Sequence, residues 1–131
     1  MPDTLHLTEI GRIAVPAADQ DRALEFYVGT LGFELRSDET FADGKMRWIE
    51  VAPRGGSTAI AIAPPMEDGP TAVDTGIVIS TSDIEADHAA LQAAGVDVDA
   101  EISRMGGEVP PMFWIRDPDG NSLIIVQPTR T

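Results

Sequence analysis

The stretch Ile10-Gly-Arg-Ile-Ala-Val-Pro-Ala-Ala-Asp19 decides the fold, because Thr75-Gly-Ile-Val-Ile-Ser-Thr-Ser-Asp83 repeats its form about 64 residues later. In both stretches, alternating apolar residues predict a half-buried strand that leads to the aspartate cap of a helix. Asp19 and Asp83 occupy equivalent places. A repeat of this length predicts two similar structural units within one chain.

Each half continues in the same order. Helices are expected over 19–31 and 83–94, each ending near a glycine, Gly32 and Gly95. Further strands are expected over 33–36, 45–52 and 57–63 in the first half, and over 96–99, 111–116 and 121–127 in the second. The pattern strand, helix, strand, strand, strand therefore occurs twice, which predicts an α+β fold. One domain is expected, with module 1 at about 7–63, a proline-rich connector at 64–73 and module 2 at about 74–127.

The composition is that of a globular protein. Of the 131 residues, 43% are hydrophobic and 24% are charged, and there is no cysteine, which excludes disulfides and thiolate metal sites. The net charge of −13 makes nucleic acid and anionic membranes poor partners. No segment has the length and apolarity of a membrane span, and the N-terminus lacks the features of a signal peptide. We therefore expect a cytoplasmic protein.

Five landmarks in this order resemble the vicinal oxygen chelate superfamily, which includes glyoxalase I, fosfomycin and bleomycin resistance proteins and extradiol dioxygenases. The landmarks are Asp19-Gln-Asp-Arg-Ala-Leu-Glu-Phe-Tyr27, Leu31-Gly-Phe33, Ser82-Asp83-Ile, Ala94-Gly-Val96 and Asp117-Pro-Asp-Gly-Asn121. The resemblance implies two βαβββ modules whose mixed, mainly antiparallel sheets curl around a cavity. It also implies a homodimer, since family members often pair modules from two chains.

The resemblance places metal ligands, in metal-using members, on the first and last strand of each module. Here the matching positions hold Arg12, Gly76 and Ile124, and the strand over 59–63 contains no donor. A guanidinium is a permanent cation without a lone pair, so Arg12 repels a metal. We expect no metal and no cofactor. His88 is expected to pack in its helix away from the cavity, and His6 to lie at the surface.

Alternation of side chains along each strand sorts the residues into a helix side and a cavity side. The candidate ligand-binding residues are those assigned to the cavity side, namely Arg12, Met46, Trp48, Glu50, Ala61, Gly76, Val78, Met112, Trp114, Arg116 and Ile124, with Ala14, Ala59, Ser80 and Val126 beside them. Both tryptophans then line an apolar cup, which suits a flat or apolar small molecule. The alternative is that Trp48 and Trp114 fill a closed core or a subunit interface.

Glu50 and Arg116 occupy equivalent places with opposite charge, which predicts an ion pair across the cup. In the alternative, Glu50 meets a cationic ligand or acts as a base. The segment 103–112, with paired glycines and paired prolines, is expected to be a long hairpin loop, or else a lid over the cup.

Three functions remain open from the sequence. The first is a metal-free protein that binds or sequesters a small apolar or aromatic molecule in the cup. The second is an enzyme, a glyoxalase-like lyase, an isomerase or an extradiol-type dioxygenase. It would be metal-dependent with atypical ligands, or metal-free with Glu50 as base and Arg12 as electrostatic stabiliser. The third is an interaction module whose own side chains fill the cup.

Overall fold

The computed structural model describes residues 5–65 and 72–128, which form two four-stranded sheets. The first sheet has the order β1 (Arg12–Pro16), β4 (Ala59–Ala63), β3 (Met46–Ala52) and β2 (Glu34–Phe41). The second has the order β5 (Asp74–Ser80), β8 (Ser122–Val126), β7 (Met112–Arg116) and β6 (Asp97–Val98). In each sheet the first pair is parallel and the others antiparallel. The predicted α+β fold with two βαβββ units is confirmed, although part of the expected connector, 66–71, lies outside the described residues.

The register of the strands explains the core. Val15 lies opposite Ile62, which in turn lies opposite Ile49, and all three side chains are buried. In the second sheet Phe113 and Ile125 form a matching buried pair. Burial of these aliphatic and aromatic side chains fixes which face of each sheet packs against the helices, because a shift of one residue would turn every side chain to the other face.

Two helical segments follow β1, and one follows β5. They are α1 (Gln20–Leu24), the π-helix η1 (Glu25–Thr30) and α2 (Ile84–Ala93). As predicted, aspartates cap both helical regions, with a side-chain oxygen 3.1 Å from the backbone N–H three residues later. The π-helix differs from the regular helix expected over 19–31. Its wider turn lets the Leu31 N–H donate to the Phe26 carbonyl, and both Phe26 and Tyr27 are buried.

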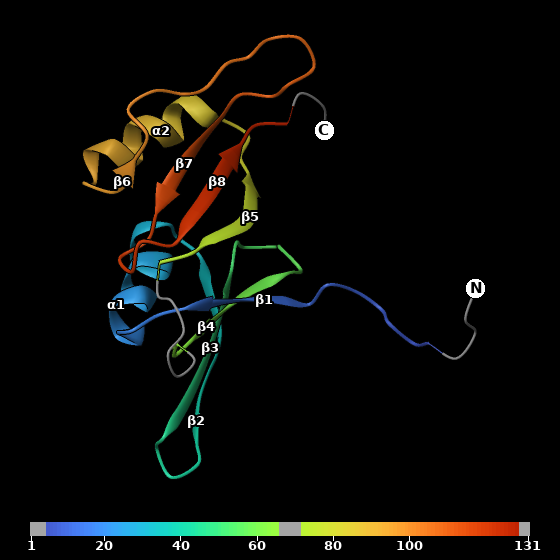
Figure 1. Ribbon diagram of the computed structural model, residues 1–131, viewed down its shortest axis with the longest axis vertical. Coiled ribbons are helices and arrows are strands. Elements are labelled where there is room, and N and C mark those ends of the chain that lie inside the picture. Colours follow the sequence, from blue (N-terminus) through green and yellow to red (C-terminus); the bar gives the residue numbers. More distant parts are fainter. Residues whose placement is uncertain (1–4, 66–71, 129–131) are drawn as a thin grey trace.

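The β2–β3 hairpin is longer than expected, since β2 continues to Phe41 instead of ending near residue 36. Figure 1 shows it projecting from the body of the molecule. Arg47 holds the hairpin on its helix side through Asp38 at 2.9 Å and Asp21 at 2.6 Å. The Arg47 guanidinium lowers the pKa of the Asp38 carboxyl through a side-chain hydrogen bond.

A buried polar network joins the two modules. The Tyr27 hydroxyl donates to Asp117 Oδ2 at 2.9 Å, and Asn121 Nδ2 donates to the same oxygen and to the Pro16 carbonyl. The other Asp117 oxygen accepts backbone N–H groups of Asp119 and Asn121. Burial, and then the charge of Asp117, raise the pKa of Tyr27 far above its usual range. The Asp117-Pro-Asp-Gly-Asn121 turn is therefore the junction between the modules.

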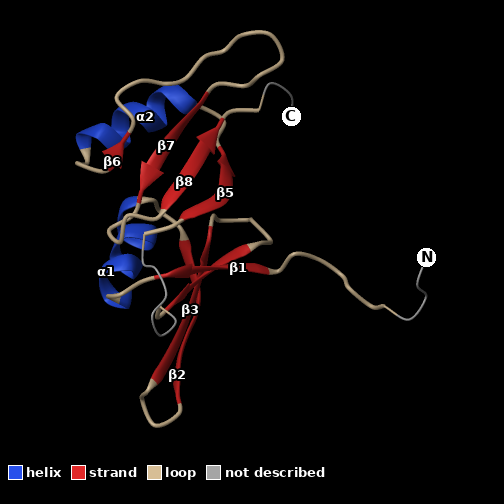
Figure 2. Ribbon diagram, in the orientation of Figure 1, coloured by secondary structure: helices blue, strands red, loops and turns tan. Residues whose placement is uncertain are grey.

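The helices lie on the same side of the two sheets (Figures 1 and 2). The opposite faces, called here the open faces, carry exposed residues of the first strand of each module, such as Arg12 and Val78. The sheets are not closed around a common cavity within this chain, in contrast to the cup expected from the sequence. No helix in the described part of the chain is both long and apolar enough to cross a membrane.

Candidate functional site

The open face of module 1 holds a compact polar group made by Arg12, Trp48 and Glu50. Arg12 Nε lies 2.8 Å from Glu50 Oε2 in an ion pair, and the same oxygen accepts a hydrogen bond from Trp48 Nε1 at 2.7 Å. The Glu50 side chain is 16% exposed, whereas that of Arg12 is 56% exposed. Because the Trp48 N–H is bonded to a carboxylate that Arg12 also holds, the position of the Trp48 indole is fixed before any ligand arrives.

Small residues lie beside this group. Ala61 is paired with Glu50 on one side and with Ala14 on the other, and Arg12 lies opposite Ala59. Directly opposite residues share a face of the sheet, so these alanines form the floor next to the indole. Ala14 is exposed, whereas Ala59 and Ala61 are buried under neighbouring side chains.

The open face of module 2 has its own indole. Trp114 lies opposite Ile124, which lies opposite Val78, and Met112 lies opposite Val126. The Trp114 backbone N–H donates to Asp99 at 3.0 Å. This face is therefore more apolar near its tryptophan than the face of module 1.

The predicted ion pair between Glu50 and Arg116 is wrong. Arg116 instead contacts Asp99 at 2.8 Å and Asp97 at 3.6 Å, while Glu50 pairs with Arg12. The physical reason is register, because β6 runs beside β7 and places Asp97 directly opposite Arg116. Each module thus supplies the counter-charge for its own charged residue.

The observed register agrees with strand alternation where strand partners are defined, as for Glu50 with Ala61 and Trp114 with Ile124, whereas Gly76 falls in an irregular part of β5. Trp48 and Trp114 are half-buried and Met46 is exposed, whereas Ala61 is buried beneath its neighbours. Contacts within each module hold the two tryptophan groups, which lie on different sheets. That these residues bind a ligand stays a prediction.

Sequence analysis missed several neighbours of the tryptophans. Glu39 lies opposite Trp48 and Phe41 opposite Met46, because β2 is longer than expected. Asp97 and Asp99 were also missed as partners of Arg116. The alternating stretch Val96-Asp-Val-Asp99 carried that signal, since it places both aspartates on one face.

The residues at the family's expected metal positions do not fit a metal ion. Arg12 brings a positive charge to one position, and Gly76 and Ile124 offer no side-chain donor. Among residues 5–65 and 72–128, no three side chains of His, Asp or Glu are grouped so that they could hold a metal ion. His88 is buried on the helix side as predicted, with Nε2 2.8 Å from the Asp99 carbonyl and its ring against Phe113.

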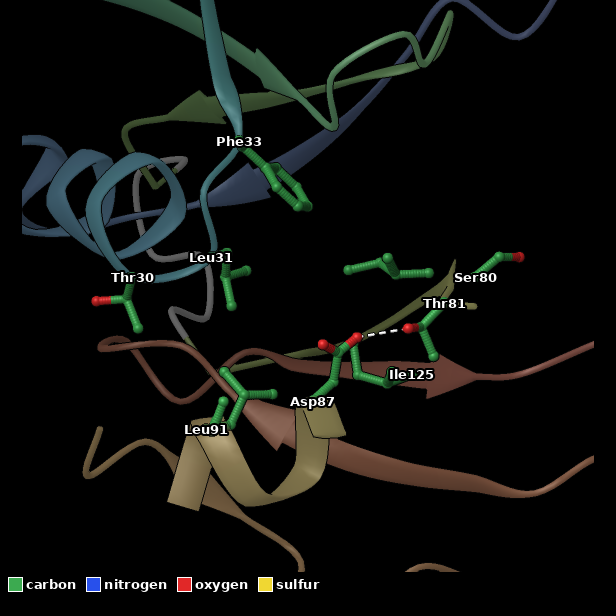
Figure 3. Close-up of a pocket in the computed structure, with 10 residues that line it drawn as sticks. Thr30, Leu31, Phe33, Ser80, Thr81, Asp87, Leu91 and Ile125 are labelled. Carbon is green, nitrogen blue, oxygen red and sulfur yellow. Dashed lines mark hydrogen bonds between the residues drawn. The ribbon is translucent and has the colours of Figure 1, made fainter. Parts of the chain in front are cut away.

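Several hollows in the described part of the chain lie between the modules. A groove of about 560 Å³ runs between β5 and the β1–β4 pair, and Ala59, Gly76 and Val78 of the candidate set line it. A smaller pocket of about 180 Å³ lies between the end of η1 and α2 (Figure 3). Phe33 and Leu31 reach it from module 1, and Leu91 and Asp87 from module 2.

The segment 103–112 forms the long loop that leads into β7 and projects at the end of the molecule opposite the β2–β3 hairpin (Figure 1). Ser103 and Met112 pair at its base, and Met105 is exposed near its tip. This agrees with the hairpin-loop interpretation. Movement of the loop as a lid stays a prediction.

The superfamily model Glyoxalase/Bleomycin resistance protein/Dioxygenase matches residues 9–125. The chain belongs to this superfamily. The structure resembles a superfamily member from Sphaerobacter thermophilus DSM 20745, with 34% identity, a TM-score of 0.85, and coverage of 94% of this chain and 99% of that one. It also resembles TnmS3, an antibiotic-binding protein from Streptomyces sp. CB03234, with 32% identity, a TM-score of 0.79, and coverage of 95% and 99%. The Bacillus subtilis (strain 168) protein YetH is 29% identical over 120 residues, which are 91% of this chain and 98% of YetH.

Proposed function

We propose that this superfamily member is a metal-free protein that binds or sequesters a small apolar or aromatic molecule against its open faces. The observation that carries the proposal is the group of Arg12, Glu50 and Trp48, in which Arg12 occupies a position where the resemblance places a metal ligand. An indole whose N–H is already bonded presents its ring to a ligand without further ordering, so less conformational entropy is lost on binding. The antibiotic-binding relative TnmS3 supports the same class of function.

The proposal includes a homodimer in the cytoplasm. In one chain the two open faces lie side by side, and Arg12 and Val78 remain exposed on them. A second copy, related by a twofold axis, would bring the open face of module 1 opposite that of module 2 of its partner. A ligand between them would then contact Trp48 of one chain and Trp114 of the other.

One observation favours a second candidate, a metal-free enzyme. Arg12 and Glu50 are in direct contact, so a carboxylate able to accept a proton lies beside a guanidinium able to stabilise an anion. In an enzyme of this kind Glu50→Gln would abolish turnover, whereas in a binding protein the same change would only lower the affinity for the ligand.

Intrinsic fluorescence tests the leading proposal, because the chain has two tryptophans and both are in the candidate site. We expect a panel of neutral, cationic and anionic aromatic compounds to include some that quench or shift the emission. For those compounds, Trp48→Leu and Trp114→Leu should each weaken binding, measured by calorimetry, about tenfold through loss of stacking and contact area.

Met105→Leu, on the exposed loop, is the matched control and should leave affinity unchanged. Elemental analysis of the same dialysed protein should find no stoichiometric metal. Emission that no compound perturbs, or an equivalent of iron, zinc, nickel or manganese lost with an open-face substitution, would contradict the proposal.

A further inference from the structure

The pocket between the end of η1 and α2 lies on the helix side of the sheets, away from the tryptophans of the open faces (Figure 3). Its walls are mostly apolar and come from both modules. Leu31 and Phe33 reach it from module 1, and Ile79, Leu91 and Ile125 from module 2. Sites for drug-sized molecules measure about 300–1,000 Å³, so a pocket of about 180 Å³ suits a smaller ligand.

Contacts within the protein hold the walls of this pocket in place. The Leu31 N–H donates to the Phe26 carbonyl at 2.9 Å, which ties that wall to the π-helix. Phe33 and Ile125 belong to the buried core, and Leu91 packs against it. The hollow therefore exists before a ligand arrives, and little conformational entropy is lost in shaping it.

Among the described residues that line the pocket, Asp87 alone carries a charge. Asp87 and Leu91 are four positions apart and share one face of α2. Figure 3 shows the carboxylate turned from α2 toward the side of the pocket that holds Phe33. Its Oδ2 accepts a hydrogen bond from the Thr81 hydroxyl. None of the ion pairs among residues 5–65 and 72–128 includes Asp87, so its charge is not neutralised there.

The fold itself does not require this polar pair. An offset of 64 residues, which relates the two helix caps, places Asp87 on Ala23 and Thr81 on Ala17. Both alanines are buried in the core of module 1. Since one module builds the same elements with two methyl groups at these places, the carboxylate and hydroxyl of module 2 have no structural counterpart and are available for recognition.

Charge decides which small molecule the pocket suits. A carboxylate beside apolar walls attracts a cation, and it does so more strongly than a fully hydrated surface group because less water screens it. The net charge of −13 acts in the same direction, so an anion would be repelled both locally and at a distance. An ammonium group can meet the Asp87 carboxylate while an attached apolar group covers Leu31, Phe33 and Leu91.

We propose that this pocket is a second binding site, which takes a small organic cation with an apolar body, such as a primary amine on an aromatic or aliphatic group. The ammonium bonds to Asp87, and the apolar body lies between the walls of the two modules. Neither tryptophan lines the pocket, so this inference does not rest on the proposed function of the open faces.

Nuclear magnetic resonance tests the site and its charge preference together. The probes are benzylammonium, neutral benzyl alcohol and benzoate, which share a ring and differ in charge. We expect benzylammonium to shift the backbone amide signals of Leu31, Phe33 and Leu91 in a saturable manner. Benzyl alcohol should bind at least about fivefold more weakly, and benzoate should not bind. The indole N–H signals of the two tryptophans report on the open faces in the same spectra.

Three variants locate the effect. Asp87→Asn removes the charge and should raise the Kd of benzylammonium at least about fivefold, to that of benzyl alcohol. Ala90→Leu places a larger side chain in the pocket and should prevent the binding of both compounds. Glu101→Gln removes one charge from an exposed position outside the pocket and is the matched control, which should leave the affinity unchanged.

The possible failures are distinct. Shifts confined to the indole N–H signals would overturn this inference and leave the proposed function standing, whereas shifts of the pocket amides without the indoles would support it. Absence of any shift at the pocket amides would overturn the site. Equal affinity of the unmodified chain for benzylammonium and benzyl alcohol would overturn the choice of a cation, and this comparison does not depend on the folding of a variant.

Discussion

The two modules share one order of elements but carry opposite charges at equivalent places on their third strands. In module 1 that place holds Glu50, which forms an ion pair with Arg12 and accepts a hydrogen bond from Trp48. In module 2 it holds Arg116, which forms ion pairs with Asp97 and Asp99. Each module therefore neutralises its own charge. The fold does not need the modules to face one another within a chain, and their open faces remain available to a partner.

The turns before the last strand of each module differ more. In module 1 the turn is Pro53-Arg-Gly-Gly56, in which the Gly56 N–H bonds back to the Pro53 carbonyl. In module 2 it is Asp117-Pro-Asp-Gly-Asn121, whose buried side chains reach Tyr27 and Pro16 of module 1. One turn only connects two strands, whereas the other joins two halves of the protein.

The largest effect is expected at this second turn. Asp117→Ala removes an acceptor of four hydrogen bonds and leaves buried donors unpaired, so we expect the free energy of unfolding to fall by about 3 kcal/mol. Urea unfolding followed by tryptophan fluorescence measures it. Arg54→Ala, in the corresponding turn of module 1, should change stability by less than about 0.5 kcal/mol. Equal losses in both variants would show that the turns do not differ as described.

A smaller effect is expected for Tyr27, the only tyrosine of the chain. Burial and Asp117 raise its pKa in the folded protein above the ordinary value of 10.0, so the folded state favours the protonated hydroxyl. The contribution of Tyr27 to the free energy of unfolding is therefore constant below about pH 10. It is lost as the pH rises above that value, because the tyrosine of the unfolded chain then ionises.

We expect the ultraviolet absorbance of tyrosinate to appear only as the protein unfolds in alkali. Tyr27→Phe should cost about 1 kcal/mol at neutral pH and should remove this part of the alkaline loss of stability. Tyrosinate absorbance in the folded protein near pH 10 would show that the hydroxyl is not held at the junction.

The smallest effect on stability is expected at the helix caps, where the two modules are alike. Asp19→Ala and Asp83→Ala should each lower the free energy of unfolding by about 1 kcal/mol, because each removes an acceptor for a backbone N–H. Asn at either position should restore most of the loss, because its side-chain oxygen can accept the same bond. A cost confined to one of the two caps would break the equivalence of Asp19 and Asp83.

The sequence predicted what depends on local periodicity. Strand alternation sorts Arg12 and Ala14 from Ile13 and Val15, and it holds because one face of β1 packs against the core. It also predicted the aspartate caps, whose hydrogen bonds span only three residues. Such features need no knowledge of distant partners.

Features that depend on the pairing of distant residues were not predictable in the same way. The partner of Glu50 is set by the register between β1, β4 and β3, and the partners of Arg116 by the short strand β6. The length of β2 depends on its pairing with β3 out to Phe41. The relative placement of the modules depends on contacts between distant residues, such as Tyr27 with Asp117, which lie 90 residues apart. Several pairings of the strands and several placements of the modules are compatible with the same alternation of buried and exposed residues.

The π-helix η1 allows module 1 to accommodate one residue more than module 2 between the helix cap and the following glycine. From Asp19 to Gly32 the chain has one residue more than from Asp83 to Gly95, so an alignment of the two halves must change its offset inside this helix. In a regular α-helix, an extra residue would rotate everything after it by about 100°, which would move Phe33 out of the core. The wider turn absorbs the residue locally and leaves both ends in place. A chain shortened by one position at exposed Gly29 can therefore build the same module with a regular helix.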